Sequence, residues 1–115
     1  MEVLIANNHQ TIRYGLTLVV EELWDGCTIF EANTLNEVVS IISAQDIDLV
    51  IFDVNVPDSE NLEDLMHFIS KETDVVVLLG NEKDAKRIAS LQEAGVAKFL
   101  FRDHSIEDLK AILCS

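Results

Sequence analysis

Short apolar segments alternate along the chain with longer segments in which apolar residues recur every three or four positions. The short segments cover residues 2–6, 27–32, 48–53, 74–79 and 97–101. Runs of this length are typical of strands. The segments between them are typical of amphipathic helices, as in the first, where Ile12, Leu16 and Val19 share one side. Alternating strands and helices predict an α/β doubly wound fold, with a parallel five-stranded sheet covered on both faces.

The order of the strands follows from how continuously apolar each one is. A strand covered on both faces is apolar throughout, whereas an edge strand tolerates polar residues. The second and fifth segments carry Thr28, Glu31 and Lys98, while the other three are nearly uninterrupted. The second and fifth strands are therefore expected at the edges. This selects the order 2-1-3-4-5, which is the flavodoxin-like order.

That order predicts where a ligand or partner site lies. Its switch point falls between the first and third strands, and open α/β sheets bind ligands beyond the carboxyl ends of the strands at that point. The residues delivered there are Asn7, Asn8 and Asp53. A carboxylate that closes an apolar strand at this place is a candidate functional residue.

Local signals agree with the expected helices. Thr34 with Glu37 forms a capping box, and Ser105 with Asp108 resembles one. Gly95 is placed to end the fourth helix.

Length and composition indicate one soluble, globular domain over residues 1–115, with 49% hydrophobic and 25% charged residues. No apolar run approaches the length of a membrane span, and no basic leader precedes the first strand. Cys27 and Cys114 form no metal-binding pair, which fits a reducing compartment and a cytoplasmic location. The final helix is short and stops abruptly, as expected for a domain cut from a longer protein.

The charge of the chain is large and unevenly distributed. Eight basic and 21 acidic side chains give a net charge of −13, which opposes binding of this domain alone to nucleic acid. Arg13 and Lys71 are the only bases before residue 80, whereas residues 80–115 hold equal numbers of each sign. A like copy or another partner is therefore expected to dock on the fourth helix, fifth strand and fifth helix.

Three stretches together resemble the receiver domain of two-component response regulators, in the branch that precedes a helix-turn-helix output domain. Residues 3–16, with His9 and Arg13, are similar to the first strand and helix of those receivers. Residues 48–57 are similar to the phosphoacceptor strand and loop, and residues 95–103 to the fifth strand.

The resemblance implies a signalling domain that is not itself an enzyme. In such receivers the aspartate at the position of Asp53 takes a phosphoryl group from a histidine kinase, and Mg²⁺ offsets the repulsion between two anions. The implied metal ligands are Asn8, Asp53 and the carbonyl of Asn55. Phe99 stands at the switch aromatic, and Arg102 stands where receivers carry a lysine.

This sequence departs from the receiver pattern at three places. Asn7 and Asn8 replace an acidic pair, Arg102 replaces the lysine, and Leu79 stands where a hydroxyl residue is usual. Amide oxygens hold Mg²⁺ poorly, so any Mg²⁺ site is expected to be weak. Arg102 does not reproduce a compact ammonium group. An ion pair with Arg102 would give Asp53 a structural role instead of a role in phosphoryl transfer.

We therefore predict an atypical receiver domain involved in transcription regulation, acting mainly through protein contacts with impaired phosphorylation at Asp53. One alternative is an ordinary phosphoacceptor receiver, served by a histidine kinase. Another, from a different class, is a flavodoxin-like binder of a small ligand, although the loop after the first strand has no glycine to cradle a phosphate. Tyr14 and Trp24 are expected to be packing residues.

Overall fold

Five strands form one parallel sheet in the computed structural model, which describes residues 1–54, 62–80, 85–101 and 104–114. The strands are β1 (Glu2–Ala6), β2 (Thr28–Ala32), β3 (Leu49–Asp53), β4 (Asp74–Leu79) and β5 (Lys98–Phe101). Their order is β2-β1-β3-β4-β5. The doubly wound fold and the strand order expected from the sequence are confirmed.

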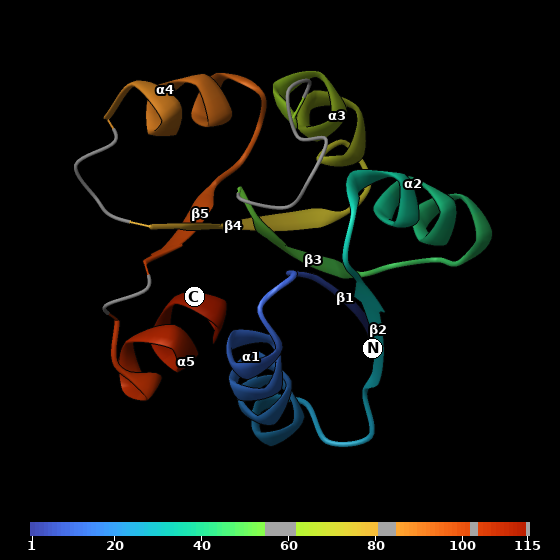
Figure 1. Cartoon of the computed structure of the whole chain (residues 1–115), viewed down its shortest axis with the longest axis vertical. Helices are drawn as coiled ribbons and strands as arrows, with labels where there is room; N and C mark the ends of the chain where they lie inside the picture. The colour runs from blue at the N-terminus through green and yellow to red at the C-terminus, as the bar shows by residue number, and fades with distance from the viewer. Residues whose placement is uncertain (55–61, 81–84, 102–103, 115) are drawn as a thin grey trace.

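Helices cover both faces of this sheet. They are α1 (Gln10–Leu23), α2 (Leu35–Ala44), α3 (Leu62–Ile69), α4 (Ala85–Glu93) and α5 (Ile106–Cys114). In Figure 1, α1 and α5 lie on one side of the sheet, and α2, α3 and α4 lie on the other. Among the described residues, none of these helices combines the length and apolar character needed to cross a bilayer.

The alternation of side chains along each strand divides the core into two layers. Val3 and Ile5 of β1 belong to the cluster beneath α1 and α5, whereas Leu4 and Ala6 belong to the cluster beneath α2, α3 and α4. Successive side chains in a strand point to opposite faces, so a strand buried on both faces must be apolar at every position. All five residues of β3 are buried, and the four before Asp53 are accordingly apolar.

The edge strands differ from the central ones as expected. Residues Thr28 and Glu31 of β2 are exposed, and Lys98 of β5 is half-buried. Phe99 and Phe101 of β5 both pack against the cluster beneath α2, α3 and α4, so they point to the same face of the sheet.

The helix-end signals are also confirmed. The Thr34 side chain accepts the Glu37 N–H at 3.2 Å, and Ser105 and Asp108 cap each other reciprocally. Gly95 has a φ of 107°, in the left-handed region that favours glycine at a helix end. The expectation for Tyr14 was wrong. Its side chain is 67% exposed, because its position on α1 faces away from the sheet.

Candidate functional site

The backbone brings Asn7 and Asp53 together at the carboxyl edge of the sheet. Strands β1 and β3 are neighbours, with Ala6 paired to Phe52, so the residues that follow lie side by side. The Asn7 N–H donates to the Ala32 carbonyl at 3.0 Å, and the Val54 N–H donates to the Leu78 carbonyl at 3.2 Å. These bonds fix the carboxyl ends of β1 and β3. They therefore also fix the backbone from which the side chains of Asn7 and Asp53 extend.

A direct hydrogen bond joins the two side chains. Nδ2 of Asn7 donates to Oδ2 of Asp53 at 2.8 Å, and each residue is only 1% exposed. They are the buried polar residues of the described chain. A bond to an ionised acceptor in a buried place is stronger than one between neutral groups. Asn7 therefore presents a donor, rather than an oxygen, to the carboxylate.

The other end of the Asn7 amide is also occupied. Its Oδ1 accepts the backbone N–H of His9 at 2.5 Å, which closes a turn just before α1. Reversing the amide would set an oxygen against the carboxylate and an NH₂ group against the His9 N–H, so both contacts favour the observed orientation. The amide is held from two sides.

Arg13 extends this arrangement to β2. Its Nη1 donates to the Asn7 carbonyl at 3.1 Å and also contacts Oδ1 of Asn33, while its Nε lies 3.7 Å from Oε2 of Glu31. From the sequence, Arg13 was linked only to the family resemblance. One feature of the sequence could have singled out Arg13 as a site residue: Arg13 and Lys71 are the two lysine or arginine residues before residue 80.

Of the remaining residues predicted for the pocket, three lie within the described ranges and two lie outside them. Asn8 is exposed, Leu79 is 1% exposed within the apolar cluster beneath α3 and α4, and half-buried Phe99 packs against that same cluster. Asn55 and Arg102 lie outside the described residues. Their roles, and the ion pair between Asp53 and Arg102, stay predictions.

Comparison with known proteins decides the family. Residues 3–114 match the model of the response regulator receiver domain. The chain belongs to this family. The receiver is 32% identical over 114 residues to the KDP operon transcriptional regulatory protein KdpE of Escherichia coli K12, covering 96% of this chain and 48% of KdpE. It is also 28% identical to the transcriptional regulatory protein YdfI of Bacillus subtilis, covering 94% of this chain and 51% of YdfI.

Solved structures share the fold of this receiver. A LuxR family DNA-binding response regulator from Silicibacter pomeroyi superposes with a TM-score of 0.83 at 23% identity, over 99% of this chain and 88% of its own. RcsB from Salmonella enterica serovar Typhimurium, bound to promoter rprA, superposes with a TM-score of 0.82 at 17% identity, over 99% of this chain and 66% of RcsB. The receiver spans about half the length of the curated relatives it matches.

Receiver domains are signalling domains of two-component systems, and they typically bind Mg²⁺ at an acidic pocket. The described residues of this receiver fit that ion poorly. Mg²⁺ requires near-ideal octahedral oxygen ligation, yet Oδ1 of Asn7 is engaged by His9 and its NH₂ group faces Asp53. Within the described ranges, no group of three or more acidic, histidine or cysteine side chains could hold a metal.

Proposed function

We propose that this chain is an atypical receiver, with impaired phosphorylation at Asp53, that acts mainly through protein contacts. The observation that carries the proposal is the hydrogen bond from Asn7 to Asp53 at 2.8 Å, made by an amide whose oxygen is already bonded to His9. A donor occupies the position from which receivers of the usual pattern offer an acidic oxygen. The Asp53 carboxylate is thereby stabilised without a metal ion.

The proposal also assigns the residues that surround Asp53. Asn8, Asp53 and the Asn55 carbonyl would supply a weak Mg²⁺ site, and Arg102 would supply the cation in place of a lysine. Buried Leu79 has no hydroxyl with which to hold a phosphoryl group or to draw Phe99 inward. Phosphorylation and the movement of the aromatic residue would therefore both be weakened.

Intact mass spectrometry tests the impaired phosphorylation. The wild-type receiver is incubated with acetyl phosphate and Mg²⁺ beside a variant that carries Asn7→Asp and Asn8→Asp. We expect the wild type to keep its mass and the variant to gain one phosphoryl group. Equal uptake by both proteins, abolished by Asp53→Asn, would instead assign the chain to ordinary phosphoacceptors served by a histidine kinase.

The protein contacts are assigned to residues 80–115, where charges balance, with a second copy or a signalling protein as partner. Lys86 on α4 is exposed, whereas Arg87 is paired at 3.0 Å with Glu63 of α3. Lys86→Glu is therefore the cleaner charge reversal. Lys71→Glu is the matched control, because Lys71 is also exposed but lies outside the segment. Sedimentation at low and moderate salt should show weaker self-association only for Lys86→Glu.

Membership of the receiver family favours these assignments over a flavodoxin-like binder of a small ligand. We further assign the chain to the cytoplasm and to transcription regulation, as one domain of a longer regulator. The names of KdpE and YdfI as transcriptional regulatory proteins support the second assignment. The free thiols of Cys27 and Cys114 fit a reducing compartment.

A further inference from the structure

Arg13, on α1, bridges the chain segments that follow β1 and β2. Its Nη1 donates to the Asn7 carbonyl at 3.1 Å and also to Oδ1 of Asn33. Asn7 directly follows β1, and Asn33 directly follows β2. Arginine side chains are mostly exposed, yet this one is only 18% exposed. Its contacts therefore hold it against the edge of the sheet rather than in solvent.

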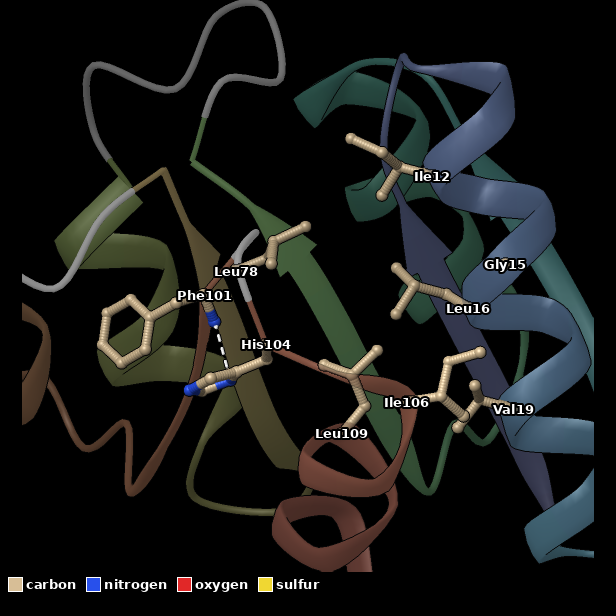
Figure 2. Close-up of a pocket in the computed structure, with 9 residues that line it drawn as sticks. All are labelled: Ile12, Gly15, Leu16, Val19, Leu78, Phe101, His104, Ile106 and Leu109. Carbon is tan, nitrogen blue, oxygen red and sulfur yellow. Dashed lines mark hydrogen bonds between the residues drawn. The ribbon is translucent and has the colours of Figure 1, made fainter.

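The helix that carries Arg13 is firmly seated on the sheet. Leu16 and Val19 of α1 are 4% and 3% exposed, and both belong to the core cluster on that face of the sheet. Figure 2 shows the two side chains on the side of α1 that faces Leu109 of α5. Arg13 therefore reaches the sheet edge from a helix whose position is fixed by packing.

Every polar atom of Asn7 is held by a described partner. Its N–H donates to the Ala32 carbonyl at 3.0 Å, and its Oδ1 accepts the His9 N–H at 2.5 Å. Its Nδ2 donates to Oδ2 of Asp53 at 2.8 Å. The remaining atom is the backbone carbonyl, which accepts the bond from Arg13. Arg13 thus completes the set of bonds that fixes this residue.

The bond to the Asn7 carbonyl also controls the side-chain amide. The peptide group between Asn7 and Asn8 is planar, so holding this carbonyl sets the direction in which the chain continues to His9. That direction places the His9 N–H against Oδ1 of Asn7. The terminal torsion of asparagine is broad, so the amide turns readily unless its oxygen is held. With the oxygen held, the NH₂ group points to Asp53.

A guanidinium group suits this task better than an ammonium group. Its donors lie in one plane and in fixed directions, and Nη1 of Arg13 serves two oxygens of separate segments. The ion pair with Glu31 is secondary. Nε lies 3.7 Å from Oε2 of Glu31, beyond hydrogen-bond distance, and the Glu31 side chain is 52% exposed. The two bonds of Nη1 are therefore the contacts that matter.

We propose that Arg13 is a positioning residue for Asp53. By holding the Asn7 carbonyl, it keeps the Asn7 NH₂ group turned toward the carboxylate. The proposal rests on the proposed function, in which that NH₂ group impairs phosphorylation, and it adds the means by which α1 and the end of β2 regulate the pocket. Within the described ranges, the Arg13 side chain makes its hydrogen bonds and its ion pair with Asn7, Asn33 and Glu31. Its effect on Asp53 therefore passes through Asn7.

The Asn7 side-chain amide gives a direct NMR readout in the full chain, and Asn7→Ala identifies its signal. In the wild type, its protons should exchange with water more slowly than those of exposed Asn8. Arg13→Met keeps an apolar stem but removes the donors, and should speed the Asn7 exchange by about tenfold or more. Glu31→Gln is the matched control. It removes the ion pair, keeps both bonds of Nη1, and should leave the exchange unchanged.

A double-mutant cycle separates positioning from plain packing. Arg13→Met should raise the equilibrium constant for unfolding less in an Asp53→Ala background than in the wild type, by about threefold or more. The reason is that no carboxylate then remains for Asn7 to be positioned against. Urea denaturation of the four proteins measures this. Arg13→Lys repeats the exchange measurement at unchanged net charge, and the Asn7 protons should again exchange faster than in the wild type.

Any of three results would overturn the proposal. The first is Asn7 exchange that Arg13→Met leaves unchanged. The second is an equal cost of Arg13→Met with and without Asp53, which would make Arg13 a packing residue only. The third is wild-type exchange in Arg13→Lys, which would assign the effect to charge. Neither measurement uses a phosphodonor or a metal ion, so phosphoryl uptake by the wild type would contradict the proposed function without changing these results.

Discussion

Asn7 donates a hydrogen bond to Asp53 across 2.8 Å, although the two residues are 46 positions apart in the chain. Both side chains are almost fully buried. In a buried site a carboxylate needs donors or cations to offset its lost hydration. Asn7, which directly follows the neighbouring strand β1, supplies one such donor. The stability of the fold should therefore depend on this hydrogen bond.

The first prediction concerns that donor. Asn7→Ala removes the amide from a buried carboxylate and should lower the free energy of unfolding by about 1–3 kcal/mol. Asn8→Ala is the control and should change it by less than about 0.5 kcal/mol, because Asn8 is exposed. Urea denaturation measures both. The combined Asn7→Ala and Asp53→Ala variant should cost less than the sum of the single changes. Additive costs would contradict the coupling.

The second prediction concerns Mg²⁺. The melting temperature of the wild-type receiver should stay constant when MgCl₂ replaces NaCl at equal ionic strength. The Asn7→Asp and Asn8→Asp variant should be less stable without metal, because carboxylates then repel each other. Saturating Mg²⁺ should restore it, by about 2.7 kcal/mol at 100 times the dissociation constant. Comparable stabilisation of the wild type would show that the amides do not impair the metal site.

The third prediction concerns pH and the ion pair between Lys110 and Glu22. The folded pKa of Lys110 lies above its ordinary value of 10.5, chiefly because of the hydrogen bond to Glu22. The stabilisation is therefore fully present below the unfolded pKa of 10.5, and it is lost as pH rises through the higher folded value.

The difference in unfolding free energy between wild type and Lys110→Met measures this contribution, because other titrating groups are common to both proteins. The difference should be constant from pH 8 to about pH 10 and should shrink above that. Lys71→Met is the control for an exposed lysine. A difference that does not change with pH would argue against the pair.

The fourth prediction concerns Gly95. Gly95→Ala should destabilise the protein by about 1–3 kcal/mol, because its φ of 107° is unfavourable for a residue with a Cβ atom. The added atom would also collide with Oγ of Ser70, which donates to the Ala94 carbonyl at 3.2 Å. Combining Gly95→Ala with Ser70→Ala should recover part of the loss. Thermal unfolding in which the double variant equals Gly95→Ala alone would show that only the backbone conformation matters.

The sequence by itself determined the fold and the position of the candidate site at the carboxyl edge of the sheet. The unbroken apolar run of β3, against the polar residues Glu31 and Lys98 in β2 and β5, was enough to order the strands. This works because a strand covered on both faces is apolar along its length, whereas an edge strand tolerates polar side chains; Asp53, at the carboxyl end of β3, is the exception. The same order placed Asn7 beside Asp53, since parallel neighbours end at the same edge.

Only the tertiary structure decided what these residues do to each other. Asn7 could have offered either its oxygen or its NH₂ group to the pocket, and the choice depends on the His9 N–H and the Asp53 carboxylate together. The reach of Arg13 to the end of β2 likewise depends on how α1 lies against its neighbours. Periodicity records which face of a helix or strand is buried. The partner that each polar atom meets is set by segments distant in the chain.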